Sequence, residues 1–131
     1  MTRGLGPRSM ASVSQYFAED RQMVWDAIIQ ALEGIPLEVK DEERGIVRTH
    51  WVAGWSSNKT SGVFLEGQWH ERTRLIVTLI SEHEKTYASI SSQREEKAPG
   101  GSQAYRWVRT TSDGIPERDF LKKLEHVLGR E

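Results

Sequence analysis

The sequence predicts an α+β domain in which one antiparallel β-sheet carries two helices on a single face. Two stretches, residues 20–33 and 116–128, place apolar side chains at helical spacing. Most of the chain between them alternates apolar and polar residues, as half-buried strands do. Each helix has one apolar stripe to bury, and the simplest packing buries both stripes against the same face of the sheet. The expected order of elements is therefore β-α-β-β-β-β-α.

The first strand and the first helix are predicted from the beginning of this pattern. Residues 12–18 alternate, and Glu19 or Asp20 is expected to cap the helix that follows, because an acidic side chain can accept from the free amides of the first turn. Gly34 ends this helix and Pro36 prevents it from resuming. The apolar stripe of the helix comprises Val24, Trp25, Ile28, Ile29, Ala31 and Leu32.

A short hairpin is predicted next. Residues 37–40 and 46–53 alternate as strands, and the polar turn 41–45 joins them, with Gly45 available for a positive φ angle. Regular alternation along the second strand places its side chains on two faces. One face would carry Val47, Thr49, Trp51 and Ala53, and the other Ile46, Arg48, His50 and Val52.

A longer hairpin is expected in the second half of the chain. Residues 69–82 form a strand whose apolar centre indicates a position inside the sheet, residues 82–85 form the turn, and residues 86–93 form the partner strand. Two polar or charged stretches that contain several Gly, residues 54–67 and 94–102, predict loops.

The end of the chain predicts a second helix. Residues 104–109 are compatible with a last strand or with a helical turn, and periodicity does not choose between them. Pro116 suits the first turn of the helix. We expect residues 1–11 to be a disordered leader and residues 12–131 to form a single domain. The apolar stripe of the second helix comprises Phe120, Leu121, Leu124, Val127 and Leu128.

Composition and charge narrow the function classes. The 131 residues include 18 Lys and Arg, 19 Asp and Glu and no Cys, for a formal net charge of −1. This balance gives no electrostatic reason to expect nucleic acid as a partner, since phosphate binding requires a concentrated basic surface. The absence of Cys excludes disulfides, thiol catalysis and cysteine-ligated zinc. No apolar run approaches the ~20 residues of a membrane-spanning helix.

Residue types that serve in catalytic and metal sites occur without a pattern that would assemble them. Residues 70–71 and 82–84 combine His with Glu, but neighbours along a strand point to opposite faces, and the turn residues are expected to be solvated. No nucleophile elbow surrounds a serine, and no phosphate-binding loop is present. We therefore expect no enzymatic activity, no metal and no cofactor.

Aromatic and arginine side chains are the features that favour a binding surface. Both types are enriched at protein interfaces. Trp25 lies on the stripe of the first helix and is expected in the core, and burial within the sheet is the alternative for the other tryptophans. The candidate interaction surface comprises Trp55, Asn58, Lys59, Phe64, Trp69, Arg72 and Arg74.

The stretch before the long loop resembles a known family. Residues 24–28 read VWDAI, residues 31–33 read ALE, and residues 41–51 read DEERGIVRTHW. This combination is similar to the helix-grip domains of BamC (NlpB)-like outer-membrane lipoproteins. In these domains a VW-x-A helix precedes a hairpin with the pattern acidic-x-x-x-G-x-(I/V)-x-T-x-W. The similarity extends over residues 13–128. It implies a helix-grip-like fold and a non-catalytic accessory role in the assembly of outer-membrane β-barrel proteins.

The resemblance also implies a location and a class of partner. Such proteins are exported and lipid-anchored in Gram-negative bacteria, so we expect a monomer at the periplasmic face of the outer membrane, with other envelope proteins as partners. Contact with the membrane would be made only through a lipid anchor that the given sequence does not contain. The alternative is a carrier of a small apolar ligand or lipid, since a curved sheet that grips a helix can enclose an apolar cavity. A well-formed internal pocket would favour the carrier, and a filled core would favour the interaction module.

Overall fold

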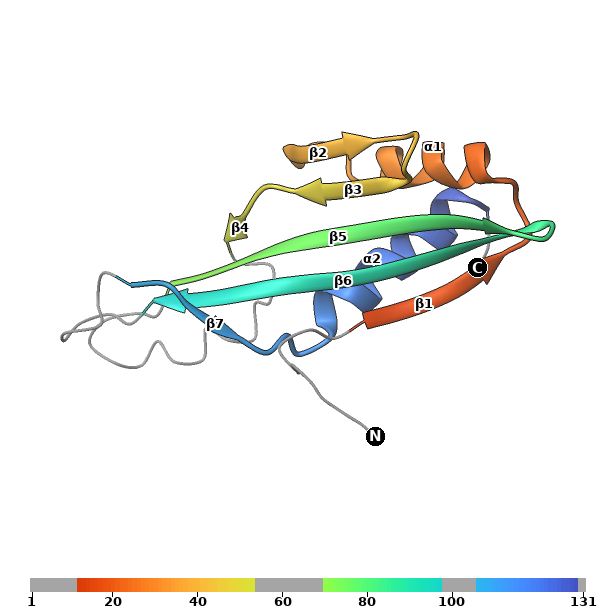
Figure 1. The fold of residues 1–131 in the computed structure, drawn as a ribbon. Helices are drawn as coiled ribbons and strands as arrows, with labels where there is room; N and C mark the ends of the chain where they lie inside the picture. Colours follow the sequence, from red (N-terminus) through yellow and green to blue (C-terminus); the bar gives the residue numbers. More distant parts are fainter. Residues whose placement is uncertain (1–11, 54–69, 98–105, 130–131) are drawn as a thin grey trace.

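The computed structural model describes residues 12–53, 70–97 and 106–129. These residues form a seven-stranded antiparallel sheet and two helices in a helix-grip-like α+β arrangement, which confirms the predicted fold class (Figure 1). The elements are β1 (Ser12–Phe17), α1 (Arg21–Ala31), β2 (Leu37–Asp41), β3 (Ile46–Thr49), β4 (Val52–Ala53), β5 (His70–Glu82), β6 (Lys85–Lys97), β7 (Val108–Thr110) and α2 (Ile115–Val127).

The hairpin of β5 and β6 is the longest feature of the sheet (Figure 1). The two strands pair without a break from Glu82 opposite Lys85 to His70 opposite Lys97. The strand order is β1-β6-β5-β3-β2, with β4 also paired to β5 and β7 also paired to β6. The predicted loop at residues 94–102 is therefore wrong for residues 94–97. These charged residues remain in the strand because β5 pairs with all four of them on one side and β7 pairs with residues 94–96 on the other.

Alternating burial along the strands separates the two faces of the sheet. On β5, Thr73, Leu75, Val77 and Leu79 are buried, and the residues between them are partly exposed. The buried residues pack against both helices in one core, which α1 and α2 contribute to from the same side. We call the opposite face, which carries Arg72, Arg74, Ile76 and Thr78 on β5, the outer face.

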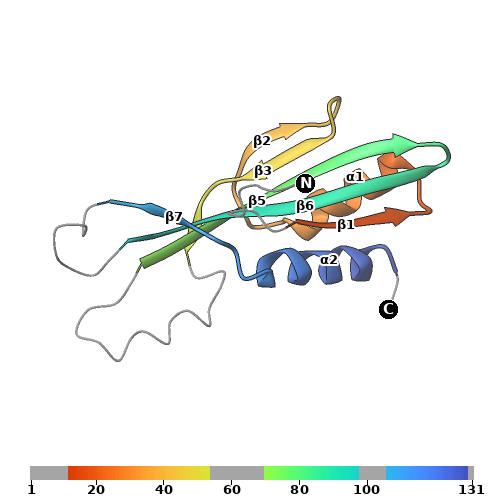
Figure 2. The same cartoon turned by 60° about the horizontal axis from the view of Figure 1, so that its bottom comes forward.

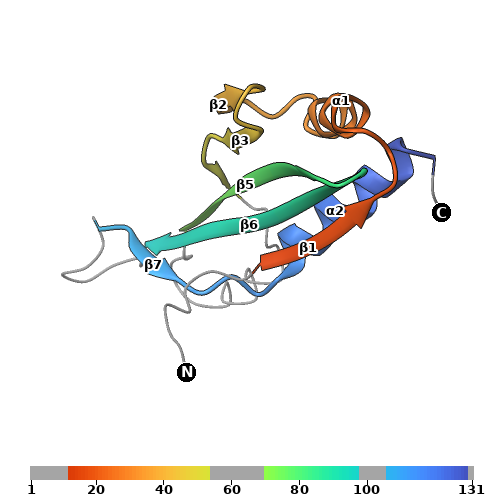
Figure 3. The same cartoon turned by 45° about the vertical axis from the view of Figure 1, so that its right-hand side comes forward.

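The helices cover the inner face in two places. α2 lies along β1 and the neighbouring part of β6 (Figure 2), and α1 is seen nearly along its axis in Figure 3, with β2 and β3 beside it. The core joins Val24, Ile28 and Phe120 of the helices to Leu75 and Ile90 of the sheet. No helix in the described part of the chain combines the length and apolar character needed to cross a membrane.

Local signals in the sequence set several element boundaries as predicted. Asp20 caps α1, and its carboxylate accepts a hydrogen bond of 2.9 Å from the Met23 amide. α1 ends at Ala31, and Gly34 follows with a φ angle of +91°. Gly45 adopts a φ angle of +73° in the turn between β2 and β3. The open choice at residues 104–109 is resolved in favour of a strand at residues 108–109, which begin β7, whereas residues 106–107 are neither strand nor helix.

The predicted alternation along residues 46–53 is interrupted at His50. Val47 and Thr49 face the core, but Trp51 lies on the outer face, where it contacts arginines of β5. The Thr49 hydroxyl takes the place of a backbone acceptor, because it accepts a hydrogen bond of 3.1 Å from the Leu75 amide. The placement of Trp51 on the same face as Val47 was therefore wrong. This interruption divides the predicted strand into β3 and β4.

Candidate functional site

Two of the predicted surface residues lie together on the outer face. Arg72 and Arg74 are separated by one buried residue of β5, so their side chains project from the same side of the sheet. The other predicted residues lie outside the described part of the chain: Trp55, Asn58, Lys59, Phe64 and Trp69.

The two arginines pack against two indole rings. The guanidinium carbon of Arg72 lies 4.5 Å from the centroid of Trp51 and 4.1 Å from that of Trp107. The guanidinium carbon of Arg74 also lies 4.5 Å from the Trp51 ring. These distances are within the range of cation–π attraction. We call Trp51, Arg72, Arg74 and Trp107 the tryptophan–arginine cluster.

The sheet topology brings the two indole rings to Arg72 from opposite flanks. Trp51 lies between β3 and β4, which pair with one edge of β5. Trp107 directly precedes β7, which lies beyond β6 on the other side of β5. The interruption of alternation at His50 is what directs Trp51 to the outer face. The cluster therefore depends on residues that are far apart in the sequence.

Two carboxylates are shared between four arginines around the cluster. Glu95 accepts from Arg72 Nε at 3.0 Å and Nη2 at 2.6 Å, and also from Arg109 at 3.4 Å. Glu38 accepts from Arg48 at 3.2 Å and from Arg74 at 3.1 Å. Such charge-assisted contacts fix the planes of the guanidinium groups.

The cluster is partly screened from solvent. The side chains of Arg72 and Arg74 are 29% and 17% exposed. Burial lowers the pKa of the Arg74 guanidinium from its usual value, and repulsion from Arg48 acts in the same direction. Arginine nevertheless remains protonated in proteins, so the outer face retains its positive charge.

Sequence analysis did not identify Trp107 and Glu95 as members of this site. A signal for Glu95 was available: continuing the register from the predicted turn at residues 82–85 places Glu95 opposite Arg72, as is observed. The signal was missed because β6 was expected to end before this residue. Trp107 had no comparable signal, since its position depends on the pairing of β7 with β6.

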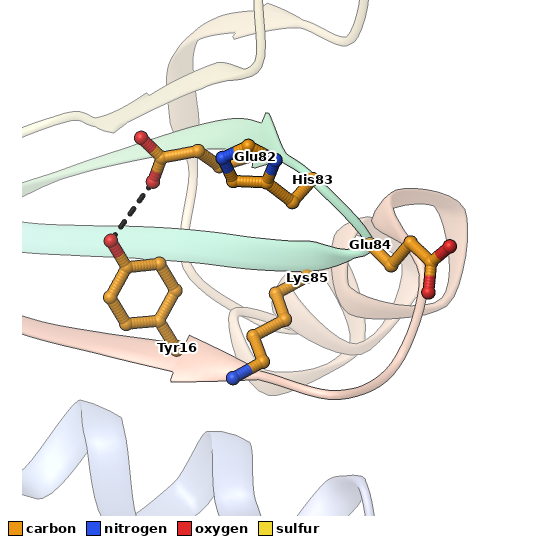
Figure 4. A pocket seen from close by; sticks show the side chains of 5 residues that line it. All are labelled: Tyr16, Glu82, His83, Glu84 and Lys85. Atoms are coloured by element: carbon orange, nitrogen blue, oxygen red, sulfur yellow. Dashed lines mark hydrogen bonds between the residues drawn. The ribbon is translucent and has the colours of Figure 1, made fainter.

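A second feature is an open hollow beside the turn of the long hairpin (Figure 4). Tyr16 of β1 donates a hydrogen bond of 2.9 Å to Glu82, and this bond raises the pKa of the Tyr16 hydroxyl because the nearby carboxylate disfavours the phenolate. The remaining lining residues, His83, Glu84 and Lys85, are exposed and point in different directions. The arrangement lacks the convergent buried groups of a ligand site.

We expect that Glu82→Gln lowers the pKa of Tyr16 toward the usual tyrosine value of about 10. The amide carries no negative charge to oppose phenolate formation. The folded wild-type chain binds the Tyr16 proton more tightly than the unfolded chain does. The resulting stabilisation of the folded state is complete below the Tyr16 pKa of the unfolded chain, and it is lost as pH rises through the Tyr16 pKa of the folded chain. An NMR titration of the Tyr16 ring carbons measures the change. Glu84→Gln is the control, and an equal effect of both substitutions would contradict the assignment.

A third feature is a pocket of about 320 Å³ between α1, α2 and β4. Apolar side chains form most of it, and Asp119 and Lys123 of α2 lie among its lining residues. The core next to it is filled, because Ile28 of α1 and the C-cap residue Leu32 are 0% and 2% exposed. The apolar lining residues are Ala31, Ile35, Val52, Ala53 and Phe120.

No group of three or more His, Cys, Asp or Glu side chains in the described residues is placed to hold a metal ion. His83 lies in the exposed turn with a φ angle of +60°, as expected for a solvated position. His70 and Glu71 are neighbours along β5 and lie on opposite faces, as expected, since Glu71 accepts a hydrogen bond from the inner-face residue Thr73.

Comparisons with known proteins do not assign the chain to a family. No protein-family model and no curated protein sequence matches the chain. Among solved structures, the Thermus thermophilus protein TTHA0849 matches with 11% identity over 91% of this chain and 96% of its own, at a TM-score of 0.36. An uncharacterised protein of Bacillus thuringiensis matches with 10% identity over 89% of this chain and 96% of its own, at a TM-score of 0.37.

Proposed function

We propose that the chain is a non-catalytic protein-interaction module that binds its partner through the tryptophan–arginine cluster on the outer face. The observation that carries the proposal is the packing of Arg72 between interface-type aromatic residues, at 4.5 Å from Trp51 and 4.1 Å from Trp107. Neither helix of the described chain covers this face. Trp and Arg contribute more binding energy at protein interfaces than most residue types.

The rigidity of the cluster supports this function. Arg72 is held by two rings and by two hydrogen bonds to Glu95, and Arg74 is held by Trp51, Gln93 and Glu38. Long arginine side chains normally lose rotamer freedom when they bind a partner. Because these side chains are already fixed, less conformational entropy is lost on association.

A location in the cell envelope is part of the proposal. The resemblance of residues 13–128 to BamC-like lipoprotein domains supports an accessory role in outer-membrane β-barrel assembly, at the periplasmic face of the outer membrane. In the source organism, the full-length protein should then incorporate radiolabelled palmitate and remain with the outer-membrane fraction. Recovery of unlabelled protein in the cytosol would contradict this location.

Site-specific cross-linking tests the binding surface. A photoreactive residue at Ser91, which lies on the outer face of β6 two pairs along the hairpin from Arg74, should yield a discrete adduct in cells. The same residue at exposed Lys122 of α2 should not. We expect Trp107→Ala to remove the Ser91 adduct while circular dichroism shows an intact fold. Equal adducts from both positions, or an adduct that persists in the folded Trp107 variant, would contradict the proposal.

A carrier of a small apolar ligand is the second candidate, and the pocket beside Phe120 is the observation that favours it. Its volume of about 320 Å³ is at the lower end for ligand sites. Native mass spectrometry of protein purified from the source organism tests this function. A bound lipid that is lost in Ala31→Trp and retained in Trp107→Ala would establish the carrier. Protein that emerges free of ligand would count against it.

A further inference from the structure

We infer that the outer face recognises an acidic segment of the partner protein, with Asp or Glu side chains directed at the tryptophan–arginine cluster. This inference rests on the proposed function and adds the chemistry of the partner. Its basis is the unequal number of cationic and anionic side chains around the cluster, together with the fixed directions of the arginines.

Among the described residues, the cationic side chains outnumber the carboxylates on this part of the outer face. Glu38 and Glu95 are the carboxylates that pair with the arginines there in the described chain. Each of them accepts from two arginines, so neither can neutralise all of its partners. A further cation comes from β6, where the ammonium of Lys97 lies 5.2 Å from the Trp107 ring. The five cationic side chains are Arg48, Arg72, Arg74, Lys97 and Arg109.

The carboxylates at the neighbouring positions of β5 and β6 do not neutralise this excess positive charge. Glu71 and Glu96 alternate with outer-face residues and therefore lie toward the inner face, where Glu71 accepts from Thr73 and Glu96 accepts from the buried Arg94. An incoming carboxylate would thus meet positive charge without displacing an existing partner.

The unused donors favour carboxylates. Each guanidinium group has five N–H donors in a planar fork. Arg109 uses one nitrogen in its contact with Glu95 and is 41% exposed, and Arg48 uses Nε in its contact with Glu38 and is 36% exposed. The donors of these groups that have no partner among residues 12–53, 70–97 and 106–129 can bind a carboxylate in the bidentate manner that arginine favours.

The dimensions fit one segment of polypeptide. The cations extend across four neighbouring strands, from β3 to β7, and along β5 from the pair of Arg48 and Ile76 to that of His70 and Lys97. With ordinary strand spacing and rise, this area measures about 15 Å by 20 Å. An extended stretch of about six residues covers that length.

An acidic protein segment fits better than a nucleic acid or an anionic membrane. Nucleic-acid binding relies on a broad basic surface, and the chain as a whole has a net charge of −1. Membrane surfaces attract clusters of Lys and Arg that adapt to lipid headgroups. Here the two central arginines are instead fixed by indole rings and carboxylates, which suits a partner of defined geometry.

Peptide binding to the purified chain tests the inference. The probes are a six-residue peptide of alternating Glu and Val and its matched peptide of alternating Gln and Val, followed by NMR of the indole and arginine Nε–H signals. We expect the Glu peptide to shift the Trp51, Trp107 and Arg72 signals and to bind about tenfold more tightly than the Gln peptide at low salt. Equal affinity for the two peptides would overturn the inference.

Charge-matched variants locate the binding. Lys97→Gln with Arg109→Gln removes two rim cations while Arg72 keeps its two hydrogen bonds to Glu95, and should weaken Glu-peptide binding about tenfold. Arg118→Gln with Lys122→Gln removes the same charge from exposed positions of α2 and should leave the affinity unchanged. Equal weakening by both pairs would show general electrostatic attraction and overturn the inference.

Two further probes separate the alternatives. Vesicles of phosphatidylglycerol and single-stranded DNA should not compete with the Glu peptide at equal charge concentration. Stronger binding of either probe than of the peptide would assign the face to lipid or nucleic acid and overturn the inference. If the peptide fails to bind while the Ser91 adduct still depends on Trp107, the partner chemistry is wrong and the interaction module stands. If the Ser91 adduct forms equally well in the folded Trp107→Ala variant, the proposed interaction module is itself wrong.

Discussion

Replacing Glu117 by alanine is expected to lower the free energy of unfolding by about 3 kcal/mol. The Glu117 side chain belongs to α2 and is fully buried, with 0% exposure. It accepts a hydrogen bond of 2.7 Å from Ser92 of β6 and one of 3.1 Å from Ser112 before the helix. The substitution removes the acceptor of both hydroxyls and leaves a cavity at the junction of helix and sheet.

The expected loss of stability in Glu117→Ala is the net result of opposing contributions. Hydrogen bonds to a charged group contribute about 1.5–3 kcal/mol each, and the first turn of α2 further favours a carboxylate through the helix dipole. Removing the carboxylate also removes its desolvation penalty, which reduces the net loss. The serine hydroxyls left behind are buried, because Ser92 and Ser112 are 0% and 8% exposed. The loss of their acceptor therefore dominates.

Chemical denaturation measures the effect, and two comparisons make it specific. Glu84→Ala removes a carboxylate from the exposed hairpin turn and should change stability by less than about 0.5 kcal/mol. A double-mutant cycle of Glu117→Ala with Ser92→Ala should give a coupling energy of about 1–2 kcal/mol. A loss below about 1 kcal/mol for Glu117→Ala would mean that this buried network does not fasten α2 to the sheet.

The sequence was sufficient to predict elements whose determinants are local. Asp20 and Gly34 delimit the first helix, and the turn at residues 82–85 sets the hairpin. Each of these signals acts over a few residues. Periodicity then assigned the apolar stripes of both helices to the core, where they are found.

The sequence was insufficient where tertiary contacts decide the structure. The side chain of Thr49 accepts from the Leu75 amide where the pairing with β5 is interrupted, and Trp51, which follows this interruption, lies on the outer face. The charged residues 94–97 resemble a loop in isolation, yet pairing on both edges keeps them in β6.

In the candidate site, too, local pattern predicts some features and tertiary contacts determine the others. Arg72 and Arg74 were selected as arginines suited to an interface, and alternation correctly places them on one face. Their packing partners were not selected, because Trp51 and Trp107 reach them through the interruption at His50 and the pairing of β7. Residue types can be identified from the sequence, but the cluster forms only because the order of the strands in the sheet brings these residues together.

Replacing Gly45 by alanine is expected to lower the free energy of unfolding by about 3 kcal/mol, since two unfavourable effects coincide there. The φ angle of Gly45 is +73°, a conformation that costs an alanine about 1–2 kcal/mol. An added Cβ atom would also lie 2.6 Å from the Leu79 carbonyl oxygen. The backbone cannot move away freely, because the Leu79 amide donates a hydrogen bond of 2.7 Å to the Gly45 carbonyl.

Gly34→Ala separates these two effects. Gly34 has a similar φ angle of +91°, but an added Cβ atom there would meet nothing within 4 Å. Its replacement should therefore cost only the conformational part, about 1–2 kcal/mol. The additional loss at Gly45, measured by urea denaturation of both variants, reports the close approach of the β2–β3 turn to β5. Equal losses would show that the turn can move aside, and the contact with Leu79 would then not fix the position of β3 beside the long hairpin.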